Sequence, residues 1–497
     1  MKTKKYALMA SLVLSLTATT ASAQVGQPFI HDPSTLAECD GKWYTFGTGG
    51  GGIMSLDGGY TWASGYDLNG EFVRVERPGG GAAPDVIKIG DRYLIAYGAT
   101  GGGLGGSHSG RMLTMWNKSL DPKSPDFKFS EPVEVAKSVD GEDFDCIDPC
   151  LFLDPTTGRL WITCGTYFGE IRLFELDPKT GARKAGNEAV TVAIDCEASA
   201  LFYKDGWYYL LGTHGTCCDG VNSTYNIVCG RSKTVTGPYL DNVGRPMTQG
   251  GGKMVVKAHD KAVGAGHFGR TVVQDGIEKM SFHWEADFVQ GGSSVLAIRP
   301  IIWKNAWPEA GYPIKQGVYE LESQRHGYSL ELAVDFQRLN VARRGGFGFG
   351  RQQSNEPVVE VQRQKLEDVQ GAWPTGDIEV RNGDFMVRPH QQWQITPAEG
   401  KGGFLGSPYY KITIAGTNRA LVATADKEVK TVAEYTGADE QLWQIDQLTD
   451  GTYRIMPKAI PGCTKKLALI SIADSTPTLG DFDFNNDNCK WMLRGIE

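Results

Sequence analysis

Five stretches of the chain share one pattern, in which a turn containing glycine is followed by large apolar residues at alternate positions. They are DGKWYTFGT (40–48), GDRYLIAYGAT (90–100), TGRLWITCGTY (157–167), DGWYYLLGTH (205–214) and DGIEKMSFHW (275–284). Alternation with a period of two after a glycine turn is typical of a strand in a β-hairpin. The copies recur at intervals of roughly 50 to 70 residues, which indicates an internally repeated sheet.

Further strand patterns follow each copy, such as GRMLTMWNKSL after the second and GEIRLFELD after the third. Antiparallel sheets of this kind, repeated radially, form a β-propeller whose first strands line a central channel. The sequence therefore predicts an all-β protein that begins with a five-bladed β-propeller over residues 24–303. Within the blades, Trp207, Tyr208 and Tyr209 are expected to be core residues, because alternate strand positions are buried.

A polar residue precedes each glycine turn by about the length of one strand. The five residues are Asp32, Asp85, Asp148, Glu197 and His267. An Asp-Pro pair can simply start a strand and satisfy its own turn, but recurrence in five blades favours a shared function. In a propeller, these side chains would meet in one polar funnel.

Several carboxyl groups in one funnel suit the hydrolysis of glycosidic bonds. One carboxyl must stay protonated to donate to the leaving oxygen, while another must be ionised to activate water or attack the sugar. A third negative charge near the acid raises its pKa.

The motifs at these positions resemble those of family 43 glycoside hydrolases, most closely the endo-α-1,5-L-arabinanase branch. The resemblance rests on HDPS, APDV, IDP, the Glu before ASALFYKDGWYYLL, the segment CCDGVNSTYNIVCGRSKTVTGPYLDNVGRPM, GGGK and GAGHFG. It implies a five-bladed propeller and an inverting mechanism. It also implies that Asp32 is the general base, Glu197 the general acid, and Asp148 the residue that raises the pKa of the acid and orients it.

Other expectations concern ligands around this catalytic trio. The resemblance places His267 beside a calcium ion or other ion in the propeller channel, held through water. The residues expected to contact substrate are His31, Asp85, Asn222, Ser223, Tyr225 and Arg270. Two motifs depart from the family: its Trp-Ala-Pro-Asp is Ala82 to Asp85 here, and its Gly-Pro-Gly-His-Asn ends in Phe268. The missing tryptophan removes a sugar-stacking surface worth about 1 kcal/mol and leaves the substrate open. The glycine-rich stretch 98–111 is expected to be a surface loop, with a rim loop over the site as the alternative.

A different, threefold pattern follows a Pro- and Gly-containing connection predicted over 304–315. Trp393, Trp443 and Trp491 stand in QQWQI, QLWQI and CKWML, each downstream of a tyrosine-containing strand. Three such units resemble the ricin-type β-trefoil, also called the family 13 carbohydrate-binding module, over 316–497. The resemblance implies that the tryptophans are core residues. A long insertion, about 343–384, is expected to distort the first unit. This domain would bind glycan or, alternatively, shield the propeller.

The composition of the chain indicates where the protein is located and which classes of partner it can have. Residues 1–23 carry lysines, an apolar run and Ala-Ser-Ala, as in a secretory signal peptide. Without Lys2, Lys4 and Lys5, the 50 basic residues become 47 against 58 acidic ones, a formal charge of -11 that argues against nucleic acid. No later stretch is apolar enough to span a membrane. We expect a secreted or periplasmic monomer whose partner is a polysaccharide or oligosaccharide substrate.

The ten cysteines permit disulfides in an exported protein. Cys463 and Cys489 are the expected pair, and the adjacent Cys217 and Cys218 could bridge each other or pair elsewhere. Cys146 and Cys150 lack further ligands for a zinc site.

Three kinds of function remain open at this point. The first is a hydrolase acting on α-L-arabinan. The second is an exo-acting α-L-arabinofuranosidase, a β-xylosidase or a galactan-active enzyme of the same family. The third is a lectin that binds sugar without cleaving it, which the retained acid and base residues disfavour.

Overall fold

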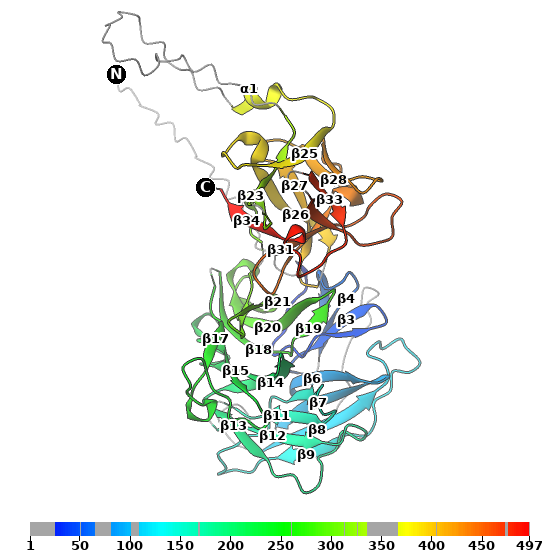
Figure 1. The fold of residues 1–497 in the computed structure, drawn as a ribbon. Coiled ribbons are helices and arrows are strands. Elements are labelled where there is room, and N and C mark those ends of the chain that lie inside the picture. Colours follow the sequence, from blue (N-terminus) through cyan, green and yellow to red (C-terminus); the bar gives the residue numbers. More distant parts are fainter. Residues whose placement is uncertain are drawn as a thin grey trace, which may run out of the picture.

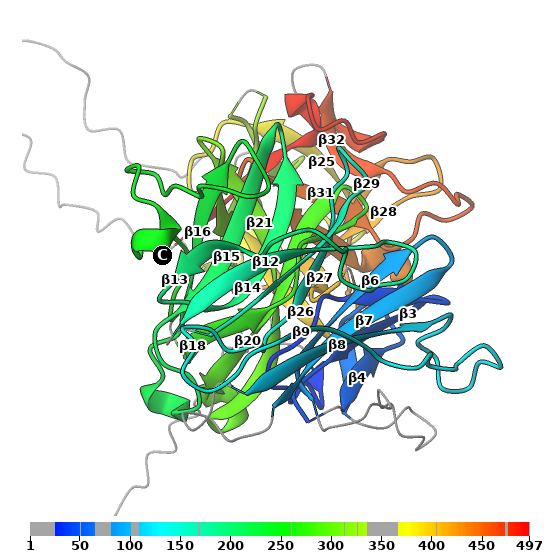
Figure 2. The same ribbon diagram turned by 90° about the horizontal axis from the view of Figure 1, so that it is seen from below.

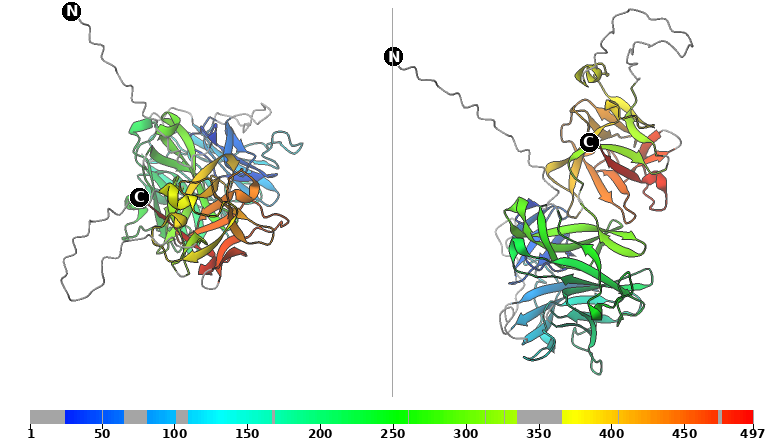
Figure 3. Two further views of the ribbon diagram at one scale, coloured as in Figure 1. Left: turned by 90° about the horizontal axis from the view of Figure 1, so that it is seen from above. Right: turned by 90° about the vertical axis from the view of Figure 1, so that its left-hand side faces the viewer.

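The computed structural model describes two β-domains stacked end to end, with the first in blue to green and the second in yellow to red (Figures 1 and 3). The described residues are 25–49, 51–64, 81–100, 109–166, 169–259, 261–312, 314–325, 327–334, 366–403, 405–472 and 476–496. The predicted signal peptide and residues 101–108 of the glycine-rich stretch lie outside these ranges. None of the helices within them is long and apolar enough to cross a membrane.

The first domain is the predicted five-bladed β-propeller. Blade 1 contains β1 (Val25–Gly26), β2 (Ala37–Cys39), β3 (Lys42–Phe46), β4 (Gly52–Ser55) and β5 (Thr61–Ser64). Blade 2 contains β6 (Ala82–Ile89), β7 (Arg92–Thr100), β8 (Gly110–Asn117) and β9 (Val133–Lys137). Blade 3 contains β10 (Cys150–Leu153), β11 (Leu160–Cys164), β12 (Glu170–Leu176) and β13 (Val190–Ile194).

Two more blades complete the ring. Blade 4 contains β14 (Glu197–Lys204), β15 (Trp207–His214), β16 (Asn226–Ser232) and β17 (Lys253–Val256). Blade 5 contains β18 (Ala262–Phe268), β19 (Val272–Gln274), β20 (Ile277–Asp287), β21 (Ser293–Lys304) and β22 (Trp307–Ala310). The repeated pattern of the sequence is the second long strand of each blade, namely β3, β7, β11, β15 and β20. Figure 2 shows blades 1 and 2 side by side, with β3 and β4 next to β6, β7 and β8.

Apolar side chains fill the space between neighbouring blades, because each sheet buries both faces. One cluster joins Tyr44 of blade 1 to Ile95 of blade 2, and a second joins Leu94 of blade 2 to Ile162 of blade 3. Tyr208 and Tyr209 are buried in such clusters, as predicted. Trp207 is only partly buried, and the cations of Arg231 and Lys233 lie over its ring.

The expected connection over 304–315 contains a strand instead of only a linker. Strand β22 pairs antiparallel with β21 and adds an outer strand to blade 5. The reason is Trp307, which is buried in the core cluster between blades 4 and 5. In the sequence, the proline inside this short strand and the glycine after it indicate a turn, which is why the strand is not predicted.

The second domain has the three-unit organisation expected of a β-trefoil. Its strands are β23 (Gly317–Ser323), β24 (Ser329–Leu332), β25 (Ile378–Gly383), β26 (Trp393–Gly402), β27 (Pro408–Ile414), β28 (Ala420–Ala423), β29 (Val429–Val432), β30 (Trp443–Gln447), β31 (Tyr453–Pro457), β32 (Ala468–Ile472), β33 (Thr476–Gly480) and β34 (Trp491–Gly495). The short helix α1 (Leu366–Gly371) and strand β25 lie inside the segment expected to be an insertion. Strand β25 pairs with β24, so the end of that segment is a regular part of the trefoil.

The three tryptophans have the same role in each unit, as predicted. All three are fully buried, and each indole N–H donates to a backbone carbonyl. Trp393 donates to Leu330 at 2.7 Å, Trp443 to Leu421 at 3.0 Å, and Trp491 to Leu469 at 2.7 Å. The tryptophans therefore define the fold of this domain.

The predicted disulfide between Cys463 and Cys489 is wrong, because both residues are free thiols. Cys489 stands where the other two units have Gln391 and Gln441. The side-chain amides of these glutamines donate to the carbonyls of Asp384 and Glu434, and the Cys489 thiol donates to Asp481. The thiol thus replaces a structural glutamine. The disulfide that the structure does contain joins Cys217 to Cys218.

The trefoil packs on blades 1 and 5 through one apolar cluster and several hydrogen bonds. Leu405 and Leu448 of the trefoil share a buried cluster with Trp62 and Ile298 of the propeller. The Arg454 guanidinium donates to the Asp275 carbonyl at 2.9 Å. The two domains are therefore held in a defined orientation.

Candidate active site

The propeller brings Asp32, Asp148, Glu197 and His267 together from four different blades. Asp32 precedes β2, Asp148 precedes β10, Glu197 opens β14, and His267 lies near the end of β18. The Nδ1 atom of His267 is 3.8 Å from Asp32 Oδ1 and 4.0 Å from Asp148 Oδ2. The sequence-based prediction that these four residues converge is consistent with this geometry.

The environment shifts the pKa values of the carboxyl groups in opposite directions, lowering that of Asp32 and raising those of Glu197 and Asp148. Burial disfavours the charged form of Asp32, but the imidazoles of His31, His267 and His283 outweigh it and hold the pKa of this carboxyl below its usual value. Burial, together with the negative charges of Asp32 and Glu285, raises the pKa of Glu197 to about 8. At neutral pH Glu197 therefore keeps its proton while Asp32 has lost its own.

Asp148 and His267 are also shifted toward their neutral forms. Burial and the charges of Glu197 and Asp32 raise the pKa of Asp148 well above its usual value. Burial, which the charge of Asp32 only partly offsets, lowers the pKa of His267 to about 4. These shifts favour a negative charge on Asp32 and the neutral forms of Glu197, Asp148 and His267.

Sequence reasoning missed three residues that hold Asp32 in place. The backbone of Asp32 is in the left-handed region, with φ of 53°. Its N–H donates to His283 Nδ1 at 2.9 Å, and the Thr48 hydroxyl donates to its side chain. His283 Nε2 in turn donates to Glu285 Oε1 at 3.0 Å. The signal was present in DGIEKMSFHWEAD, where the period of two puts His283 and Glu285 on the same face of β20.

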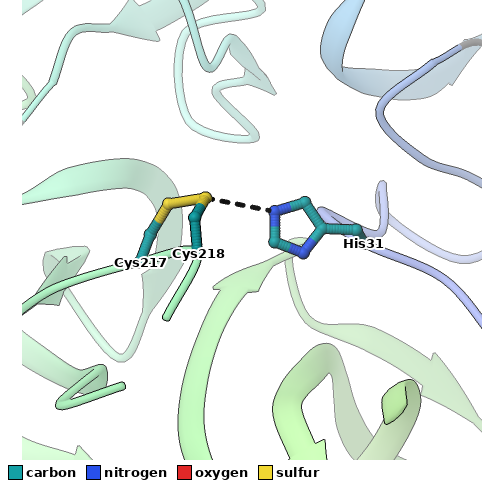
Figure 4. Close-up of side chains that lie close together, drawn as sticks. All are labelled: His31, Cys217 and Cys218. Atoms are coloured by element: carbon teal, nitrogen blue, oxygen red, sulfur yellow. Dashed lines mark hydrogen bonds between the residues drawn. A yellow bond between two sulfur atoms is a disulfide. The ribbon is translucent and has the colours of Figure 1, made fainter. Parts of the chain in front are cut away.

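Glu285 also connects this chain of hydrogen bonds to the loop that carries the disulfide. The backbone N–H of Cys218 donates to Glu285 Oε2 at 3.1 Å. The ring centroid of His31 lies 4.4 Å from that of His283. The Nε2 atom of His31 lies 3.9 Å from Cys218 Sγ of the disulfide (Figure 4). His31 Nε2 is also 3.5 Å from Asp32 Oδ1. The His31 side chain is partly exposed, with 32% of its surface accessible.

Asp85 and Arg270, which are expected to contact substrate, are both buried in the structure, with 4% and 8% of their surface exposed. They form a buried ion pair with each other. Asp85 also accepts from the N–H groups of Thr35 and Leu151, at 3.1 and 2.8 Å. Arg270 donates to the Val86 carbonyl at 2.8 Å. With their polar atoms engaged by four blades, both residues tie the ring together instead of facing a ligand.

The residues predicted on the 222–225 segment have different surroundings. Asn222 is exposed at the end of the short helix η1 (Gly220–Asn222). The Ser223 hydroxyl donates to the Thr216 carbonyl at 2.7 Å, which closes the loop that holds the disulfide. Tyr225 is 4% exposed and packs near His283. Ser223 therefore stabilises the disulfide loop, and Tyr225 contributes to the packing around His283.

The funnel contains side chains of the types that ligate metal ions. Donor atoms of His31, Asp32 and His283 lie within 4.8 Å of one another, but both ring nitrogens of His283 are used in hydrogen bonds. The Nδ1 atom of His267 is too far from the neighbouring carboxylate oxygens for direct hydrogen bonds. A water or a hydrated ion between these groups would suit a neutral imidazole beside a carboxylate.

Comparisons with known proteins identify the same two domains. The model of glycosyl hydrolases family 43 matches residues 60–308, and that of the ricin-type β-trefoil lectin domain-like family matches residues 389–466. An extracellular exo-α-(1→5)-L-arabinofuranosidase of Cellvibrio japonicus is 31% identical over 277 residues, which are 51% of this chain and 78% of that protein. An extracellular endo-α-(1→5)-L-arabinanase of Bacillus subtilis is 29% identical over 319 residues, 61% of this chain and 94% of that protein.

Solved structures show the same relationship. The crystal structure of an exo-1,5-α-L-arabinanase from a bovine ruminal metagenomic library has a TM-score of 0.52 and 30% sequence identity to this chain. The match covers 57% of this chain and 97% of that one. These findings support a glycoside hydrolase over a lectin without catalytic activity. The chain belongs to family 43 of the glycosyl hydrolases, and a ricin-type β-trefoil domain follows its propeller.

Proposed function

We propose that the protein is an exported hydrolase that cleaves α-L-arabinan with inversion at the anomeric carbon. The observation that carries this proposal is a single funnel containing an ionised carboxylate, Asp32, and a protonated carboxyl, Glu197. The substrate comes from the relatives, which are named for activity on α-1,5-linked arabinose. Export is supported by the signal-peptide pattern at residues 1–23 and by the same relatives, which are named extracellular.

In this mechanism Glu197 is the general acid and Asp32 the general base. Glu197 gives its proton to the glycosidic oxygen as the bond to the anomeric carbon breaks. Asp32 takes a proton from a water molecule that attacks the opposite face of the sugar. Thr48 and His283 orient Asp32 through its side chain and its backbone N–H, respectively.

Asp148 positions the acid and keeps the region around it uncharged. It accepts a hydrogen bond from the backbone N–H of Ala198, the residue that follows Glu197. The raised pKa of Asp148 favours its neutral form, which avoids a second negative charge beside Asp32. This role agrees with the orienting function implied by the family resemblance.

We also propose a calcium ion or other ion in the channel, held through water by His267. The support is the neutral imidazole and the long distances from its Nδ1 atom to Asp32 and Asp148. Such an ion would supply positive charge that holds the Asp32 carboxylate in its ionised form. The trefoil is proposed to bind glycan, by analogy with its lectin-like family.

The substrate is tested with a screen of linear arabinan, branched arabinan, xylan and galactan, with products separated by length. Release of arabinose alone would favour exo action, which the loss of the family tryptophan at Ala82 permits. A ladder of oligosaccharides would favour endo action. Cleavage of xylan or galactan but not arabinan would overturn the substrate assignment.

The stereochemistry is tested by proton NMR of the first product formed, before mutarotation mixes the anomers. Inversion predicts an anomer opposite to that of the bond cleaved, since the base activates water instead of attacking the sugar. A product that keeps the original configuration, or a sugar covalently attached to Asp32, would overturn the role of Asp32.

A further inference from the structure

A groove leaves the catalytic funnel along the seam between blade 1 and blade 5. It has a volume of about 600 Å³. Blade 1 lines it with the ends of the β3–β4 hairpin, Gly51 to Ile53, and blade 5 lines it with Ser293 and Ser294 at the start of β21. Phe29, from the segment that leads into the funnel, forms a bridge with Val295 of β21 and completes the wall. We call this feature the seam groove.

The seam groove is continuous with the catalytic residues. His31 and Thr48 belong to its lining, and both also contact Asp32. A chain molecule whose reacting bond lies beside Asp32 therefore has the groove next to it, on the far side of His31 and Thr48. The size is in the range of pockets that hold small organic ligands, so the groove can hold at least one additional sugar ring.

The lining has the chemistry of a surface for a neutral sugar. Among the described residues that form it, none is an aspartate, glutamate, lysine or arginine. Phe29 has 44% of its surface exposed, so part of its ring is accessible to a ligand in the groove. An aromatic face next to serine hydroxyls matches the C–H face and the hydroxyl rim of a sugar ring.

Glycines keep the groove open. A Cβ atom added to Gly47 would lie 2.5 Å from the His31 carbonyl, so a side chain is excluded there by the funnel itself. Gly51 is different, because a Cβ atom at this position would meet nothing within 4 Å. A side chain at position 51 would therefore enter open space at the groove and obstruct it without straining the fold.

We propose that the seam groove binds a sugar unit of the glycan chain beyond the units at the cleaved bond, with Phe29 as its stacking surface. Phe29 would replace, at another place on the same face, the stacking tryptophan that is missing at Ala82. The proposal rests on glycan hydrolysis in the funnel, which is the proposed function, but it does not depend on which chain-end is released.

The test compares long and short substrates in three variants. Phe29→Ala removes the stacking surface, Gly51→Leu obstructs the groove, and Gly376→Leu is the control, since a Cβ atom at this trefoil position also meets nothing within 4 Å. Kinetics are measured on linear arabino-oligosaccharides from the disaccharide to the hexasaccharide and on p-nitrophenyl α-L-arabinofuranoside. Melting temperatures check that each variant is folded.

For Phe29→Ala and Gly51→Leu, we expect the ratio of kcat/KM for the hexasaccharide to kcat/KM for the aryl glycoside to fall about 10-fold, mainly through KM. Gly376→Leu should leave the ratio unchanged. An unchanged ratio in both groove variants would overturn the proposal.

A binding measurement separates this proposal from the proposed function. In a Glu197→Gln background, calorimetry of the hexasaccharide should show about 10-fold weaker binding when Phe29→Ala is added. Binding that depends on Phe29 in a wild-type protein that cleaves no glycan would remove the hydrolase mechanism but keep the groove. Cleavage of glycan together with binding that does not depend on Phe29 would keep the hydrolase mechanism but overturn the proposal for the groove.

Discussion

Asp85 and Asp148 occupy corresponding places in neighbouring blades, but their surroundings give them opposite roles. Asp85 meets a buried arginine, Arg270, and two backbone N–H groups. Asp148 meets Glu197, and the pKa of Asp148 is raised by burial and by that like charge. A carboxyl group at the same point of a repeat is therefore structural or reactive according to whether another blade supplies a cation.

The largest effect should come from the reactive side of this comparison. Asp32→Asn and Glu197→Gln each remove one proposed proton-transfer group while keeping the shape of the side chain. Turnover on polymer should fall by roughly 10²- to 10⁴-fold, as measured by reducing-sugar release. Circular dichroism should show an unchanged fold, and near wild-type activity in either variant would refute its assigned role.

Asp85→Asn should act on stability instead, because it leaves the Arg270 guanidinium buried without its counter-ion. We expect the free energy of unfolding to fall by about 3–5 kcal/mol, measured by denaturant titration. The matched control is the double variant Asp85→Leu with Arg270→Met, which buries no unpaired charge and should lose less. If the single variant is as stable as wild type, the pair has no structural role.

His267→Ala tests whether a neutral side chain of the funnel contributes to activity as much as the charged side chains do. If an ion is held through water by His267, removal of the imidazole should lower kcat/KM by about 10-fold, and a chelator should lower wild-type activity. Melting temperature should change only by the lost ligand stabilisation. Activity indifferent to both treatments would make His267 a packing residue.

The smallest expected effect is a shift in pH dependence. Activity that needs protonated Glu197 is present below its pKa and is lost as pH rises through about 8. Glu285→Gln removes one of the negative charges that raise this pKa, so the alkaline limb should move to lower pH. Rate measurements from pH 4 to 10 would show it, with Glu278→Gln, a carboxylate elsewhere on β20, as the control.

The same logic makes opposite predictions for stability in the two regions. A raised pKa means that the folded protein binds a proton that the unfolded chain releases, so Glu197 lowers stability as pH rises from about 4.5 toward about 8. Glu197→Gln should therefore raise the melting temperature at pH 8 and change it little at pH 4. Asp85→Asn should lower it at both.

The sequence was sufficient to predict those features that depend on a repeated pattern of residues. Alternating strands gave the five blades, the spacing of acidic residues indicated the funnel, and three tryptophans indicated the trefoil. It was insufficient where the role depends on a partner from another blade. Nothing near Asp85 in the sequence shows that Arg270, 185 residues away, will meet it.

Other omissions have equally specific causes. His283 and Glu285 were hidden in a strand read only for its apolar residues, although both face the funnel. Strand β22 was hidden by its proline and by the glycine that follows it. Cys489 was assigned a covalent partner because cysteines are usually read as pairs, whereas its thiol takes the place of an amide.

The replacement of glutamine by Cys489 affects how the repeated units of the trefoil are recognised from sequence. The match to the lectin-domain family ends at residue 466, within the third unit and before Cys489, which stands there in place of glutamine. What the three units share is a donor aimed at a carbonyl seven or eight positions upstream, at Asp384, Glu434 and Asp481. The threefold symmetry of this domain is therefore a property of its hydrogen bonds and not of its residue identities. A search based on residue identity will find fewer units than the structure contains.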